Sequence, residues 1–175
     1  MTEIARYVLT VTGSDRPGLT SELSQAVLAA NGNWKEGHLS RLGGLYVGSV
    51  LVEVPQGEIA KLEGSIQAVD AGLKVSIAPA GDAPQGEARV LLFELVGQDR
   101  PGIIREVTSI LARLGANIER LSSGEKTGAW AGEKLFHAEV AATLPAGIEP
   151  EQAQTALEEI SSEIMVDFSF ETGKG

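Results

Sequence analysis

The sequence predicts an α+β protein made of two similar units, each with the order strand, helix, strand, strand, helix, strand. The tetrapeptide Asp-Arg-Pro-Gly occurs twice, at residues 15–18 and 99–102, with the copies 84 positions apart. An alternating apolar pattern typical of a strand precedes each copy, and an apolar stripe typical of a helix follows it. Further residues match at the same offset, Glu22 with Glu106 and Asn33 with Asn117.

The first unit, residues 1–79, divides into six elements by its hydrophobic periodicity and its turn residues. Pro17 suits the first helical position, where a missing N–H costs nothing, and Asn31-Gly32 ends that helix. Gly43-Gly44 between two apolar runs is a hairpin signal. The predicted strands and helices occupy residues 6–12, 17–30, 33–41, 45–54, 58–71 and 73–78.

Residues 80–88, rich in small residues and glycine, form the predicted linker, and the second unit covers residues 89–172. Its main difference is a long glycine-rich loop, 124–133, in place of Gly43-Gly44. Trp130 in this loop either contacts another molecule or folds back onto its own sheet. In both units we expect an antiparallel sheet with two helices on one face. The elements of the second unit occupy residues 89–96, 101–114, 117–123, 134–144, 150–163 and 165–171.

The composition argues against several classes of function. The net charge is −10 and no basic stripe is present, so we expect no direct nucleic-acid binding. The absence of cysteine excludes disulfides and thiolate metal ligands. No apolar run reaches membrane-spanning length and the first residues do not resemble a signal peptide, so we expect a cytoplasmic protein without a membrane partner.

Each Asp-Arg-Pro-Gly turn leads into a helix start, where free backbone N–H groups favour a small anion. Asp15 and Asp99 either receive a ligand ammonium group or cap their helices; we favour capping as the main role, and the two are compatible. Arg16 and Arg100 either hold a carboxylate or face solvent. We favour solvent, because a cation there opposes the helix dipole.

The glycines and asparagines also allow two interpretations each. Gly18 and Gly102 either let a ligand approach the backbone or permit close helix–sheet packing. Asn33 and Asn117 either are turn residues with a left-handed φ or present an amide to an amino acid. Duplication copies structural as well as functional residues, so the recurrence leaves both open.

Strand, Asp-Arg-Pro-Gly, amphipathic helix and an asparagine opening the next strand together resemble the ACT domain. Two such units without a catalytic domain resemble the glycine cleavage system transcriptional repressor family. The resemblance implies a ferredoxin-like fold and amino-acid sensing, with units paired side by side and the ligand bound at the interface of the pair. It also implies a protein partner, such as a transcription factor, and no cofactor. By match to the family, the ligand-binding residues are Asp15, Gly18, Leu19, Asn33, Asp99, Gly102, Ile103 and Asn117.

We therefore expect a regulatory protein of amino-acid metabolism that forms a homo-oligomer. One alternative is an interaction protein that binds no ligand. The other is a small enzyme on a ferredoxin-like fold, which is disfavoured because the titratable groups are scattered. His38 and His137 do not occupy matching positions and have no partner at metal-ligand spacing, so we interpret both as ordinary strand residues, with no catalytic or metal site.

Overall fold

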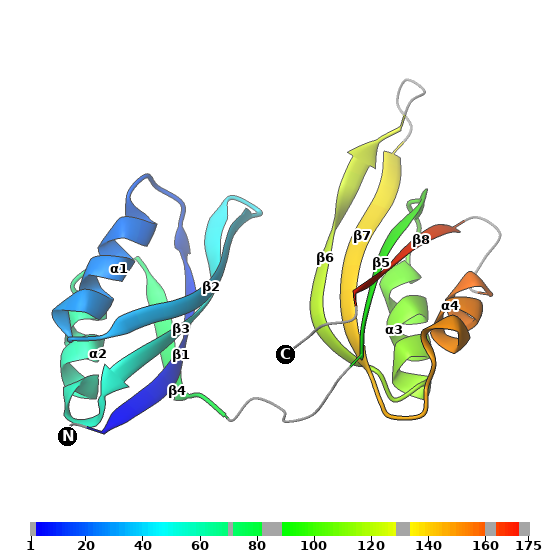
Figure 1. Cartoon of the computed structure of the whole chain (residues 1–175). Helices are drawn as coiled ribbons and strands as arrows, with labels where there is room; N and C mark the ends of the chain where they lie inside the picture. Colours follow the sequence, from blue (N-terminus) through cyan, green and yellow to red (C-terminus); the bar gives the residue numbers. More distant parts are fainter. Residues whose placement is uncertain (1–2, 70–71, 82–88, 129–133, 160–163, 172–175) are drawn as a thin grey trace. The chain divides into compact units, whose positions relative to one another are not determined.

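The computed structural model describes residues 3–69, 72–81, 89–128, 134–159 and 164–171. The chain divides into two compact units, residues 1–83 and 84–175, which are described separately. Each unit is a four-stranded antiparallel sheet covered on one face by two helices (Figure 1). This is the predicted α+β, ferredoxin-like fold, present twice.

In the first unit the strand order is β2-β3-β1-β4, which places β1 and β3 in the centre and leaves β2 and β4 as edges. β1 pairs antiparallel with both β3 and β4. A single 3-10 turn, Gln56–Glu58, leads into the second helix. The elements are β1 (Ile4–Ser14), α1 (Leu19–Ala29), β2 (Asn33–Leu42), β3 (Leu45–Pro55), α2 (Ile59–Gln67) and β4 (Lys74–Pro79).

The second unit repeats this topology with the order β6-β7-β5-β8. Its helices again follow the first and third strands of the unit, as the duplicated sequence requires. The elements are β5 (Arg89–Gln98), α3 (Ile103–Arg113), β6 (Asn117–Thr127), β7 (Lys134–Leu144), α4 (Pro150–Glu158) and β8 (Ile164–Glu171).

Each core lies between the sheet and its two helices, because alternate strand residues face the helices. In the first unit, Leu9 on β1, Val52 on β3 and Leu62 on α2 are fully buried. In the second, Leu95 on β5 and Leu157 on α4 are fully buried in the corresponding layer. Among the described residues of each unit, no helix lies on the opposite face of the sheet.

Several predicted boundaries differ from the structure. α1 begins at Leu19 rather than at Pro17, because Gly18 has a left-handed conformation that a helix does not admit. β6 continues to Thr127, since its pairing with β7 extends to Thr127 opposite Lys134, so most of the described part of the predicted loop 124–133 is strand. The rest of that loop, Trp130 included, and most of the predicted linker lie outside the described residues.

The prediction at Gly43-Gly44 is confirmed. Both glycines have positive φ, 59° and 82°, as a two-residue type I′ hairpin turn requires. No helix in the described part of the chain is long and apolar enough to cross a membrane.

Candidate functional site

The two Asp-Arg-Pro-Gly turns have the same backbone geometry. Gly18 precedes α1 with φ 92° and ψ −12°, and Gly102 precedes α3 with φ 97° and ψ −5°. These values fit the third position of a type II turn, which follows proline and needs a residue that tolerates positive φ. A Cβ built on Gly18 would meet only Glu22 Oε1 within 4 Å, at 3.6 Å. The interpretation of close helix–sheet packing is therefore wrong, and φ explains the glycine.

Neither helix is capped by a side chain. Glycine occupies the N-cap position of both α1 and α3, and neither N-cap makes a side-chain hydrogen bond. The prediction that Asp15 and Asp99 cap these helices is wrong, because each helix begins four residues after its aspartate. The first-turn N–H groups of both helices therefore lack the side-chain acceptor that usually satisfies one of them, and such groups favour an anion.

Each aspartate instead lies near a cation from the hairpin that joins the second and third strands of its unit. Asp15 Oδ2 lies 3.3 Å from Nε of Arg41 near the end of β2. In the second unit the hydrogen bond to Glu125 raises the pKa of Lys134, with a smaller contribution from the charge of Asp99. Both aspartates thus lie at the turn, beside a positive group of their own unit.

Each turn is tied to its helix by a bidentate ion pair. Arg16 donates to both carboxylate oxygens of Glu22 at 2.8 and 2.7 Å, and Arg100 donates to Glu106 at the same two distances. The prediction of solvent-facing arginines is wrong, because the first-turn glutamate provides the negative charge that the helix dipole favours at that position. The hydrogen bond from Arg100 holds the pKa of Glu106 below its usual value.

Leu19 and Ile103 are each 2% exposed and point into their cores. These buried side chains anchor the first turn of α1 and α3. A ligand at the turn would therefore contact the backbone N–H groups of these residues rather than their side chains.

The asparagines open strands rather than turns. Asn33 is the first residue of β2 and Asn117 of β6, and both are exposed. The left-handed interpretation is wrong: the positive φ falls two residues earlier, at Asn31 (53°) and Gly115 (70°), where each helix ends. Asn117 Nδ2 donates to Glu119 Oε1 at 2.8 Å.

Within one unit, the turn and the asparagine lie at opposite ends of the sheet. Asn33 pairs with Glu53, which pairs with Arg6, nine residues before Asp15. At ~3.3 Å per strand residue, this separation is roughly 30 Å. In the second unit Asn117 is connected in the same way through Thr143 to Val90, nine residues before Asp99. The structure does not bring the two halves of the predicted site together inside a unit.

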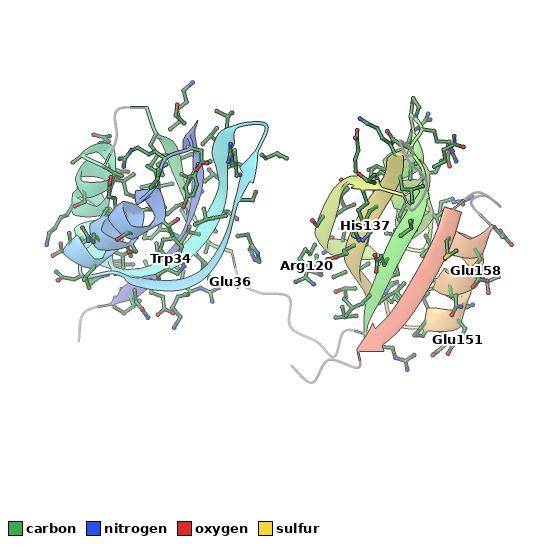
Figure 2. The ribbon with its side chains drawn as sticks, turned by 90° about the horizontal axis from the view of Figure 1, so that it is seen from above. Trp34, Glu36, Arg120, His137, Glu151 and Glu158 are labelled. Atoms are coloured by element: carbon green, nitrogen blue, oxygen red, sulfur yellow. The ribbon has the colours of Figure 1, made fainter. Side chains whose placement is uncertain are left out.

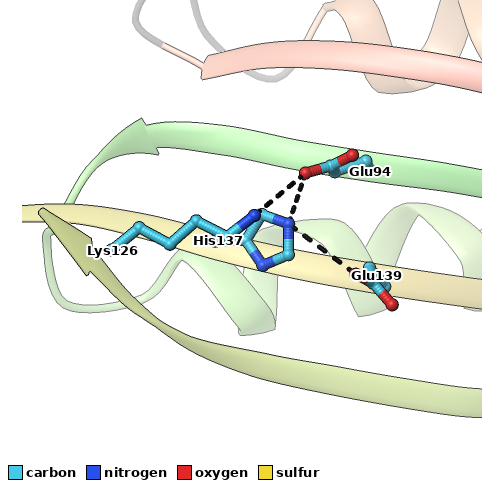
Figure 3. Close-up of polar contacts among 4 residues, drawn as sticks. All are labelled: Glu94, Lys126, His137 and Glu139. Atoms are coloured by element: carbon cyan, nitrogen blue, oxygen red, sulfur yellow. Dashed lines mark hydrogen bonds and ion pairs between the residues drawn. The ribbon is translucent and has the colours of Figure 1, made fainter. Parts of the chain in front are cut away.

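A cluster on the helix-free face of the second sheet was not predicted. His137 on β7 is 8% exposed and shares a hydrogen bond with Glu94 of β5, while Lys126 Nζ lies 3.4 Å from the same Glu94 oxygen (Figure 3). Glu139 lies 4.0 Å from the ring. The hydrogen bonds from His137 and then Lys126 lower the pKa of Glu94. Only the strand register could have revealed this cluster, and the described residues contain no group able to hold a metal ion.

Comparison with known protein families agrees with the presence of two similar units in the chain. A sequence profile of the ACT domain matches residues 6–78, and a second ACT-domain profile matches residues 91–162. The chain is a tandem ACT-domain protein. The glycine turns and both asparagines lie inside the matched regions of these two ACT domains. No curated protein sequence matches the chain.

Two solved structures resemble the tandem ACT-domain protein over almost its whole length. An unknown protein from Galdieria sulphuraria is 26% identical, with a TM-score of 0.84, over 96% of this chain and 99% of that one. A protein provisionally described as a glycine cleavage system transcriptional repressor is 18% identical, with a TM-score of 0.70, over 95% and 97%. The second likeness shows the shared fold of two ACT domains. The two matched ACT domains point to a regulatory rather than a catalytic protein.

Proposed function

We propose that this tandem ACT-domain protein regulates amino-acid metabolism by binding a free amino acid and passing the signal to a protein partner. The observation that carries the proposal is the pair of identical glycine turns, each ahead of a helix without a side-chain cap. An amino acid presents a carboxylate and an ammonium group on neighbouring atoms. The turns offer backbone N–H groups for the carboxylate and an aspartate for the ammonium group.

The Arg–Glu pairs support this assignment of roles. Arg16 and Arg100 are each bound to a glutamate of their own helix, so the ligand carboxylate would be held by backbone N–H groups rather than by these guanidinium groups. A left-handed glycine without a Cβ leaves the backbone open to close approach at that point.

The separation of roughly 30 Å between turn and asparagine, by ~3.3 Å per strand residue, sets a condition on the site. A site that uses both would take the turn of one ACT unit and the asparagine of a second. We propose that such pairing occurs and makes the protein oligomeric, or joins the two units of one chain. The ligand set would then be Asp15, Gly18, Leu19 and Asn33, with Asp99, Gly102, Ile103 and Asn117.

The partner would be a protein, such as a transcription factor, rather than nucleic acid. The net charge of −10 supports this choice, because phosphate binding depends on clustered Lys and Arg. An interaction protein without a ligand is the competing function, and it predicts no stabilisation by any amino acid.

A thermal-shift screen of the free amino acids on the full chain tests the proposal. A ligand stabilises the folded state by RT ln(1 + [L]/Kd), about 2.7 kcal/mol at a hundredfold excess over Kd. We expect one amino acid or a small related group to raise the melting temperature saturably. If none does so at millimolar concentration, the sensing function is excluded and the interaction protein remains.

A further inference from the structure

A groove runs between the two helices of the second unit. Its volume is about 590 Å³, within the usual range of small-molecule sites. Its floor includes Ile110, which is 7% exposed, and Ala156 of α4. Its polar rim and its end at the glycine turn are formed by Pro101, Gly102, Arg105, Glu106, Ser109, Arg113 and Glu159.

Arg105, Ser109 and Arg113 form one row along this groove. Successive members lie four residues apart on α3, so all three share one face of the helix. The backbone positions of the two arginines are ~12 Å apart along the helix axis, at ~1.5 Å per residue. Both arginines are exposed, and neither makes a hydrogen bond or ion pair with a described residue. Arg105 lies close enough to Glu106 to lower its pKa slightly, but that carboxylate is already bound by Arg100. The row thus keeps two guanidinium groups available for a ligand.

The first unit has no such row. The positions of α1 that match Arg105, Ser109 and Arg113 at the offset of 84 are Ser21, Gln25 and Ala29. The two helices otherwise share their length, their glycine N-cap and their Arg–Glu pair. The arginines are therefore not needed to build an ACT unit, and they distinguish this groove from the first unit.

We propose that the α3–α4 groove binds a small dicarboxylate, one carboxylate on Arg105 and the other on Arg113. A guanidinium matches a carboxylate with two parallel hydrogen bonds, and two arginines in one groove suit two anionic groups joined by a short apolar chain. Ile110 and Ala156 provide the apolar surface for that chain. Glu159 on the opposite rim disfavours the dianion and tunes its affinity. This site adjoins the proposed amino-acid site at Gly102, but its two arginines occur only in the second unit.

The test is calorimetric titration of the full chain with succinate, glutarate, adipate and pimelate, each at the same ionic strength. Butyrate is the monocarboxylate control. The variants are Arg105→Gln, Arg113→Gln and Glu159→Gln, with Arg120→Gln on β6 as a matched exposed arginine outside the groove (Figure 2). All four positions are exposed, so unliganded melting temperatures should match the parent.

We expect one dicarboxylate to bind saturably and more tightly than butyrate. Each groove arginine variant should weaken it about tenfold or more, since each loses a charge-assisted pair. Glu159→Gln should strengthen binding, and Arg120→Gln should not change it. The proposal is overturned if dicarboxylates bind no better than butyrate, or if Arg120→Gln weakens binding as much as the groove variants do. Amino-acid stabilisation is measured separately, so either function can fail alone.

Discussion

Gly18 is the residue whose identity the backbone explains most directly. With φ at 92° it lies where L-residues are disfavoured by roughly 1–2 kcal/mol, although the space around it is open. Gly18→Ala should therefore lower the free energy of unfolding by about that amount. Gly64→Ala is the control in the same unit, because Gly64 lies in α2 with no atom near its Cβ position and alanine favours helices. Urea unfolding of both variants measures the difference, and an equal effect at the two positions would contradict this explanation.

Asp99 gives a second prediction at the scale of one side chain. Because it does not cap α3, Asp99→Ala should change the free energy of unfolding without ligand by less than about 0.5 kcal/mol, as for an ordinary surface substitution. The proposed contact with an ammonium group should still be lost, so ligand-induced stabilisation should decrease. Thermal unfolding with and without ligand separates the two effects. A loss of about 1 kcal/mol without ligand would restore the capping role.

At the scale of elements, the bidentate pair of Arg100 and Glu106 couples the turn to α3. The pair holds the pKa of Glu106 below its usual value, so its stabilising contribution is present above the unfolded-state pKa. It is lost as the pH falls through the lower folded-state pKa. Arg100→Gln should raise the pKa of Glu106 and reduce the steepness of acid destabilisation in that range. An NMR titration of the Glu106 side chain, with Arg120→Gln as control, measures this; an unchanged pKa would contradict the pair's role.

The elements also show which features of the structure could be predicted from the sequence. The order of the elements could be predicted from local signals. These are the duplicated tetrapeptide, Gly43-Gly44 and the apolar periodicity. The separation of Asn33 from Asp15 depends on strand register, which joins residues distant in sequence. The Arg–Glu pair was signalled by the recurrence of Glu22 as Glu106, but its geometry depends on the left-handed glycine that delays the helix start.

For the whole molecule, the charge gives a simple prediction. The net charge of −10 should prevent salt-sensitive, micromolar binding of duplex DNA by the purified chain. Fluorescence anisotropy with a labelled duplex at 50 and 200 mM salt measures this. Tight binding that weakens with salt would contradict signalling through a protein partner.

The strand edges lead to a second prediction for the molecule. β2 and β4, like β6 and β8, are edge strands of small sheets, and unpaired edges favour association. Separately expressed halves, residues 1–80 and 87–175, should be poorly folded or self-associating in analytical ultracentrifugation. Two stable monomeric halves would count against paired ACT units.

The central claim is that an amino acid binds at the glycine turns with help from an asparagine. Its most direct test is calorimetric titration of the amino acid found in the screen into the parent chain and the Asn33→Ala/Asn117→Ala double variant. Asn31→Gly is the control, because Asn31 already has a positive φ that glycine accepts. We predict that the double variant binds at least about tenfold more weakly, as expected for loss of a hydrogen bond to a charged group, while its unliganded melting temperature stays near that of the parent. Equal affinity in the double variant and the parent would show that these asparagines are not part of the amino-acid site.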